Sequence, residues 1–168
     1  MGRMVRMSQA KEIYGLSLWR PWPWAFVNGP DYQQKRVENR TWKPPAGVEW
    51  LALHAAKRWD DEGAAYIERA TGLQVPPDAE HPSGQIFAVC RLTHVFELEW
   101  PSDVEGYPDC VSLWAFGPFC WVVDDVLPLV NPVPCPGAQG LWKLSGRPGL
   151  LEQVRAAYTE SMKARKAA

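Results

Sequence analysis

The chain contains few of the residues that metal centres and disulfide scaffolds require. It has four cysteines and three histidines in 168 residues, and no two cysteines have the two-residue spacing of a zinc knuckle. Cys90 and Cys120 lie inside apolar runs, which is typical of buried free thiols. The histidines, His54, His81 and His94, are scattered along the chain. We therefore expect no structural metal, no disulfide framework and no cofactor.

Long apolar runs are also missing. The most apolar run, Val111 to Val123, is interrupted by Gly117 and Pro118 and closed by Asp124 and Asp125, so it is too short to span a bilayer. The first residues are rich in arginine and lack the apolar core of a signal peptide. We therefore expect a soluble, cytoplasmic protein with no membrane partner.

An excess of either charge is absent as well, because the formal net charge at pH 7 is −1. The signs are nevertheless unevenly distributed. Residues 1–58 hold ten Lys or Arg and four Asp or Glu, a balance of +6, whereas residues 59–168 hold eight and fifteen, a balance of −7. A local positive field attracts phosphate even on a protein that is neutral overall. The basic half thus suits an anionic partner, although a solvated surface with uneven charge has the same composition.

Tryptophan is abundant. The chain has ten, and six of them fall between Trp19 and Trp59. With 46% hydrophobic and 22% charged residues, a chain of this length is expected to form one domain with a real core. Core packing is the usual role of tryptophan, and lining a cleft is the functional alternative.

Short apolar segments separated by proline and glycine predict many small elements. Strands are expected over 14–19, 36–41, 50–54, 84–94, 119–129 and 141–144, and helices over 24–28, 57–71 and from 148 onward. Because strands and helices do not alternate regularly, we predict an α+β fold, a small mixed β-barrel of five to six strands with two to three flanking helices.

The domain layout follows from the same pattern. Residues 1–13 are polar and basic and are expected to be frayed or disordered, and residues 14–145 form the barrel domain. Residues 146–168 form an amphipathic helix packed on the barrel, with Leu151, Val154, Tyr158 and Met162 on one stripe. The acidic stretch 99–113 is expected to be a lid or an insertion.

The segment 34–42 is the first place to look for function. It places Lys35, Glu38 and Arg40 within six residues. In a strand, Glu38 and Arg40 share a face and Lys35 lies on the other, whereas a bend at the start of the segment lets all three converge. Aromatic rings beside basic groups suit a planar, anionic ligand such as a nucleotide.

These features together resemble the ASCH domain family, a branch of the PUA-like β-barrels. The similarity covers about residues 14–145. It lies in a first strand that runs into Pro-Trp-Ala-Phe-Val-Asn-Gly at 23–29, in Lys35-x-x-Glu38-x-Arg40 followed by Thr41-Trp42, in a strand ending Leu53-His54-Ala55, and in the Gly84-led strand Gly-Gln-Ile-Phe-Ala-Val. The segment 133–142 is similar to the closing segment of some members.

The resemblance implies a β-barrel with a cleft beside the first helix and the motif strand. It implies binding of RNA, single-stranded nucleic acid or a modified nucleobase. A small branch of the family hydrolyses N4-acetylcytidine with a lysine, a threonine nucleophile three residues later and a glutamate on a later strand. Here the residue three after Lys35 is Glu38, and Thr41 lies six residues after the lysine.

Each motif residue has a functional and a structural interpretation. Lys35 binds phosphate or, with its pKa lowered by burial, acts as a base; otherwise it is a solvated strand residue. Glu38 pairs with an exocyclic amine or forms an ion pair with Arg40. Arg40 grips phosphate with its planar fork or belongs to that same ion pair. Thr41 enters only if the protein is an enzyme.

Other candidate binding residues surround the motif. They are Ser17, Trp19, Arg20, Trp22, Trp42, His54 and Lys57, with Gln139 and Trp142 as further residues that could frame the cleft. Trp22 lies near a helix start and could stack a base, and His54 could serve acid–base chemistry. Lys57 and Arg58 at a helix start oppose the helix dipole, which favours a nearby anion. Core packing or simple surface exposure is the alternative for all of them.

Three functions therefore compete. The first is a binding module for RNA or a modified base. The second is a metal-independent amidohydrolase that acts on N4-acylated cytidine or a related nucleoside, with Lys35 as base, Thr41 or Ser17 as nucleophile and Glu38 recognising the amine. The third is a scaffold whose acidic segment 97–109 and last helix bind a protein partner that the sequence does not name.

Overall fold

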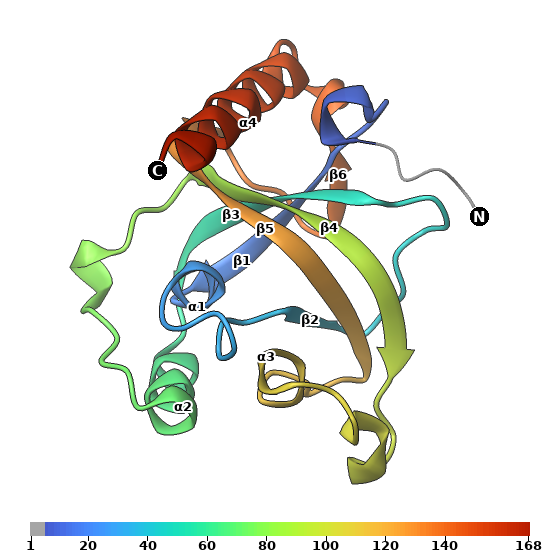
Figure 1. Ribbon diagram of the computed structural model, residues 1–168, viewed down its shortest axis with the longest axis vertical. Helices are drawn as coiled ribbons and strands as arrows, with labels where there is room; N and C mark the ends of the chain where they lie inside the picture. The colour runs from blue at the N-terminus through green and yellow to red at the C-terminus, as the bar shows by residue number, and fades with distance from the viewer. Residues whose placement is uncertain (1–5) are drawn as a thin grey trace.

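This computed structural model describes residues 6–168. They form one six-stranded sheet with four α-helices packed around it (Figure 1). The strands are β1 (Tyr14–Arg20), β2 (Val37–Arg40), β3 (Trp50–Trp59), β4 (Gln85–Glu97), β5 (Phe119–Pro134) and β6 (Leu141–Lys143). The helices are α1 (Trp22–Val27), α2 (Asp61–Thr71), α3 (Asp109–Ser112) and α4 (Leu150–Ala167). The sheet is mixed, since β1 and β3 are parallel and the other neighbours antiparallel. The expected α+β class is confirmed.

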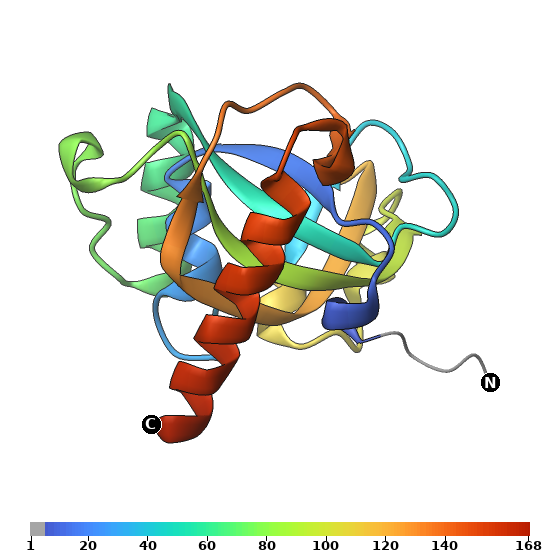
Figure 2. The same ribbon diagram turned by 90° about the horizontal axis from the view of Figure 1, so that it is seen from above.

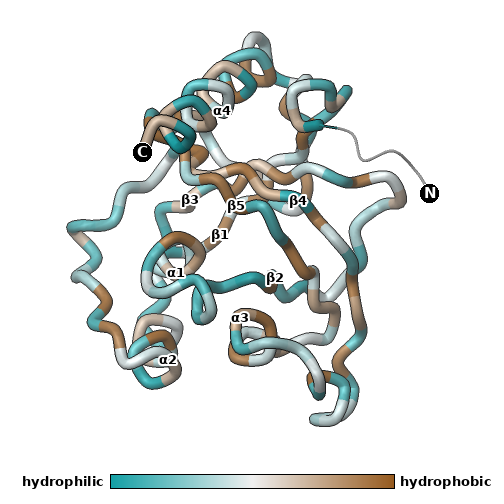
Figure 3. Tube along the Cα trace, viewed as in Figure 1, coloured by the Kyte–Doolittle hydropathy of each residue, from teal (hydrophilic) through white to brown (hydrophobic). Residues whose placement is uncertain are grey.

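Alternating side chains on β3 divide the core into two layers. Trp50 and Ala52 pack with the apolar side of α4, whereas Leu51 and Leu53 pack with Phe26 of α1. Figures 1 and 2 show the same division, because α4 lies along one side of the sheet and the three shorter helices lie on the other. In Figure 3 the apolar colour follows the crossing strands, while β2 is hydrophilic. The charged residues of β2 therefore stand at the margin of the core.

The sheet does not close into the barrel that the sequence predicts. Its order is β2-β5-β4-β3-β1-β6, so β2 and β6 are its edges within residues 6–168. β6 pairs with β1 only from Tyr14 to Leu16. The rest of β1 has no strand pairing on that side in the described chain, and it is joined to β2 by a side chain, because Arg40 donates to the carbonyl oxygen of Ser17 over 3.1 Å. A side-chain bond thus replaces the backbone ladder at this seam, which we call the β1–β2 seam.

The helix expected over 57–71 begins later than predicted. β3 continues to Trp59, and α2 begins only after Asp60, whose carboxylate accepts from the backbone N–H of Gly63. Acidic residues fill the first turn, as the helix dipole favours. Lys57 and Arg58 therefore lie on a strand, and the dipole argument for an anion beside them is wrong.

The segment before β1 is packed rather than frayed over the part that the structure describes. Met7, Ala10 and Ile13 are buried in the layer beneath α4, where Arg155 of α4 donates to the carbonyl oxygen of Ala10. Apolar residues spaced by three anchor this otherwise polar stretch. The prediction of a frayed segment is thus wrong for residues 6–13, and residues 1–5 lie outside the described part.

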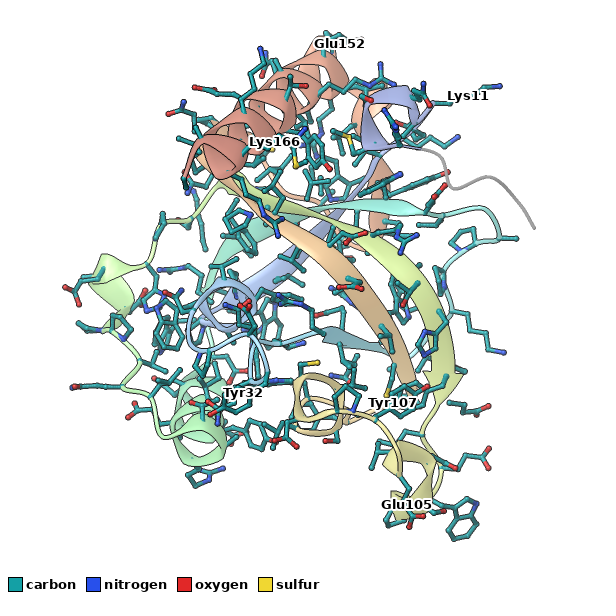
Figure 4. The ribbon with its side chains drawn as sticks, in the orientation of Figure 1. Lys11, Tyr32, Glu105, Tyr107, Glu152 and Lys166 are labelled. Carbon is teal, nitrogen blue, oxygen red and sulfur yellow. The ribbon has the colours of Figure 1, made fainter. Side chains whose placement is uncertain are left out.

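The acidic stretch 99–113 forms an excursion between β4 and β5. It contains a 3₁₀ turn, Pro101–Val104, and α3. Figure 4 shows Glu105 at its far end and Tyr107 nearer the sheet, where the Tyr107 ring stacks on Phe96 with centroids 4.8 Å apart. Within residues 6–168, none of the helices combines the length and the apolar character needed to cross a bilayer.

Candidate functional site at the β1–β2 seam

A cavity of about 350 Å³ lies at the β1–β2 seam, and we call it the first cavity. Its lining comes from β1, α1, β2 and the loop before β5. The residues are Ser17, Leu18, Trp19, Trp22, Lys35, Glu38, Asn39, Arg40 and Phe116. The three charged residues of the sequence motif thus meet in one cavity with aromatic rings beside them. The bend, one of the two geometries that the sequence allowed, is the one observed.

Lys35 is placed by the turn between α1 and β2. Its backbone N–H donates to the carbonyl oxygen of Ala25 over 2.8 Å, which fixes the chain just before β2 begins. The side chain is 3% exposed, and its ammonium donates to the carbonyl oxygen of Val37 and lies 3.5 Å from Oε2 of Glu38. Lys35 is therefore already engaged by its own strand.

The surroundings of Lys35 favour its neutral form more than water does. Burial lowers the pKa of Lys35 from its ordinary value, and the neighbouring Glu38 carboxylate opposes this in part. The ammonium also lies 4.8 Å from the ring centroid of Phe26 and 5.6 Å from that of Trp22. These ring faces and Glu38 are what stabilise a buried cation here.

Glu38 lies between two cations. Its Oε1 is 3.0 Å from Nη2 of Arg40, and its Oε2 faces Lys35. One carboxylate and two cations leave the cluster with a formal charge of +1. Within the described chain, Nε of Arg40 is buried and has no hydrogen-bond partner. The cavity wall therefore carries excess positive charge, which suits a ligand with acceptor atoms.

A relay of hydrogen bonds links β1 to β3 and to the chain after β5. Nε2 of His54 lies 2.8 Å from the carbonyl oxygen of Cys135, so this nitrogen carries the proton, because a carbonyl oxygen only accepts. Nδ1 of the neutral ring then accepts from the hydroxyl of Ser17 over 3.2 Å. Burial lowers the pKa of His54, and the charge of Arg147 lowers it further, against the effect of the Cys135 bond. His54 is thus held in its neutral form.

A second cavity of about 1120 Å³ lies directly beside the first, and the two share Ser17, Trp19 and Arg40. It is bounded by the ends of β1 and β3 and by the segment 134–140, which runs from β5 toward β6. Four further residues named from the sequence belong to it. They are Trp42, His54, Lys57 and Gln139.

Three of the residues named from the sequence lie elsewhere. The guanidinium of Arg20 is engaged within the protein. It donates to the carbonyl oxygens of Ala56 and His81 and pairs with Asp78 over 2.6 Å. Thr41 is exposed after β2 and lines neither cavity. Trp142 packs beneath β1 and lies outside both linings. Ser17 lines both cavities, and its hydroxyl is bonded to His54, which lines the second one.

Three further residues of the first cavity, Leu18, Phe116 and Asn39, were not identified from the sequence. Phe116, 48% exposed, contributes a ring from the loop before β5. Asn39 holds that loop in place, because its amide donates to the carbonyl oxygen of Trp114 and its Oδ1 accepts from the N–H groups of Phe116 and Gly117. Alternation on β2 predicts that Asn39 faces away from Glu38 and Arg40, so no local pattern indicated it as a cavity residue.

No protein-family model and no curated protein matches this chain. Within residues 6–168, no three His, Cys, Asp or Glu side chains gather in an arrangement that could hold a metal ion. The four cysteines carry free thiols. The chemistry of the site therefore has to be argued from the side chains themselves.

Proposed function

We propose that this protein is a nucleic-acid-binding module of the ASCH or PUA-like kind, which holds one nucleobase of RNA or of a modified nucleoside in the first cavity. One observation carries the proposal: Lys35, Glu38 and Arg40 line a single cavity together with aromatic rings. Its volume of about 350 Å³ is at the lower end of the range for small-ligand sites. A single base with its sugar is a ligand of this scale.

The polar groups of the cavity match the edge of a base, which carries donors and acceptors side by side. The carboxylate of Glu38 has lone pairs beyond those that face its two cations, and an exocyclic amine can use them. The guanidinium of Arg40, whose side chain is 22% exposed, supplies donors for a carbonyl or phosphate oxygen. The ring of Phe116, about half exposed, offers a surface for stacking.

Recognition fits these contacts better than catalysis by the lysine motif. A catalytic Lys35 would need a free amine, but its ammonium is bound to Val37 and faces Glu38. The threonine that the motif offers, Thr41, lies outside the cavity. We place the module in the cytoplasm, where a reducing environment keeps thiols free.

Calorimetric titration tests the proposal. Cytidine, uridine, adenosine, guanosine and N4-acetylcytidine are titrated together with short single-stranded RNAs into the wild type and into Arg40→Gln. We expect binding of at least one probe and a loss of about tenfold or more in the variant, because a hydrogen bond to a charged group contributes roughly 1.5–3 kcal/mol. Arg69→Gln, on the exposed side of α2, is the matched control. Absence of binding to every probe would refute the proposal.

The second candidate function is hydrolysis of an acylated nucleoside, and one specific observation favours it. Ser17 lies where the two cavities meet, and its hydroxyl is bonded to the neutral His54 of the second cavity, which is the relation of a nucleophile to its base. In this version Ser17 replaces Thr41 as the nucleophile. Incubation of the protein with N4-acetylcytidine, followed by ultraviolet absorbance, tests it; an unchanged spectrum at high protein concentration rules it out.

A further inference from the structure

The second cavity is additional space that a single nucleoside in the first cavity does not fill. It is about 1120 Å³ against about 350 Å³ for the first, which exceeds the range of roughly 300–1,000 Å³ for small-ligand sites. The two cavities meet at Ser17, Trp19 and Arg40, so a ligand can pass from one to the other without leaving the protein surface. The site therefore suits a ligand that continues beyond one base.

The charge of the second cavity points to an anionic ligand. Within the described chain its lining includes the cations Arg40 and Lys57 but no aspartate or glutamate. Arg40 is the only one of the two that also borders the first cavity. A phosphate placed between the cavities would meet Arg40 and have Lys57 on its far side, and such contacts are the electrostatic part of nucleic-acid binding.

Trp19 stands at the junction with an open ring. Its side chain is 46% exposed, although tryptophan is the largest apolar residue, and the guanidinium of Arg58 lies 3.7 Å from its ring centroid. Arg58 comes from β3 and lines neither cavity. An aromatic ring backed by a guanidinium at the boundary of two cavities is a platform for stacking a base.

We infer that the second cavity is the subsite for the next nucleotide of a single strand, so that the ligand is single-stranded nucleic acid rather than a free nucleoside. One base occupies the first cavity, the linking phosphate lies at Arg40, and the neighbouring base stacks on Trp19 toward Lys57. This inference rests on the proposed function, since it needs a base in the first cavity. An acidic peptide could meet the same cations but has no planar group for Trp19.

A ligand-length series tests the inference. Fluorescence titration at fixed salt compares, for each of the four bases, the nucleoside, the 5′-monophosphate, the dinucleotide and the tetranucleotide. We expect the dinucleotide to bind at least about tenfold more tightly than the monophosphate, which is within the range for stacking one base on an aromatic ring. In Trp19→Ala the ratio between these two affinities should fall to about one. Trp100→Ala, which removes an exposed tryptophan from the 99–113 excursion, should retain the wild-type ratio.

The outcomes separate the two proposals. Equal affinity for monophosphate and dinucleotide would overturn the inference and leave the base-binding function standing. No affinity for any member of the series would overturn both. Hexaglutamate is added as a competitor, and displacement of the tetranucleotide at equal concentration would show a peptide-binding cleft and overturn the inference. Thermal unfolding of each variant establishes that lost binding is not lost folding.

Discussion

Arg40 donates from Nη2 to the carbonyl oxygen of Ser17 over 3.1 Å and pairs through the same nitrogen with Glu38 over 3.0 Å. This one guanidinium connects the edge strand β2 to the part of β1 that β6 leaves unpaired within residues 6–168. The connection is also the boundary between the two cavities. Because a side chain, and not a backbone ladder, joins β1 to β2, room for a ligand remains between the two strands.

Arg40→Lys should weaken the seam. The lysine side chain is shorter and ends in a single ammonium, which does not reach the place of Nη2 between Ser17 and Glu38, so we expect the free energy of unfolding to fall by about 1–2 kcal/mol. Urea denaturation of both proteins measures the difference. Arg69→Lys makes the same chemical change on an exposed side chain of α2 and should leave the free energy of unfolding nearly unaltered. Equal effects of the two substitutions would show that the Arg40 bonds do not stabilise the seam.

Glu38→Gln should destabilise the protein through Lys35. The substitution removes the carboxylate that opposes the effect of burial on the lysine, so the pKa of Lys35 falls further and the buried ammonium loses its counterion. Breaking a buried ion pair in this way costs about 3 kcal/mol. Chemical denaturation of the single variant gives the value.

A double-mutant cycle then identifies the cause. Lys35→Met removes the buried charge, so adding it to Glu38→Gln should recover a large part of the lost free energy of unfolding. If the loss in the double variant equals the sum of the losses in the two single variants, Glu38 and Lys35 do not interact. The ion pair at 3.5 Å would then not stabilise the fold.

His54→Gln should change how stability depends on pH. Burial lowers the folded pKa of His54 below its unfolded value of about 6.5, so between these two values the unfolded state binds more protons. The free energy of unfolding therefore falls as the pH falls below about 6.5, and the contribution of His54 is fully present above that pH. A glutamine does not titrate, so the variant should lack this part of the slope.

Urea denaturation from about pH 5 to pH 8 measures both slopes. The comparison uses the slope and not the absolute stability, because the glutamine also changes the bonds to Ser17 and Cys135. His94→Gln makes the same substitution at an exposed histidine and is the matched control. If wild type and His54→Gln lose stability in parallel below pH 6.5, the pKa of His54 is not lowered by folding, and the prediction is wrong.

Local sequence patterns predicted most elements but not the ends of several strands. Apolar segments between Pro and Gly gave β1, β4 and α4 close to their observed positions, because these patterns act within a few residues. β3 ran on to Trp59 because its partner β1 extends alongside it as far as Arg20, and this tertiary pairing cannot be read from residues 55–59 alone. The cap at Asp60 was a local signal that the expected helix 57–71 overlooked.

The site was predictable in its motif and not in its surroundings. Lys35, Glu38 and Arg40 lie close in sequence, so their convergence needed only one bend before β2. Phe116 comes from a segment far along the chain, and the bonds of Asn39 hold that segment beside the cavity. Whether the barrel closes depends on pairing between β2 and β1, and no local pattern specifies that contact.

Gly137→Ala should disrupt the lining of the second cavity beside the Ser17–His54 pair. A Cβ at this position would lie 2.7 Å from the Ser17 hydroxyl and 2.8 Å from Cε1 of His54, both too close for real contacts. The segment 134–140 must then move away, which loosens the bond between His54 and Cys135. We expect a lower melting temperature and a dinucleotide affinity that falls toward that of the monophosphate. Gly146→Ala is the matched control, since its Cβ would meet nothing within 4 Å, and an equal loss in both variants would show that close packing at Gly137 does not shape the second cavity.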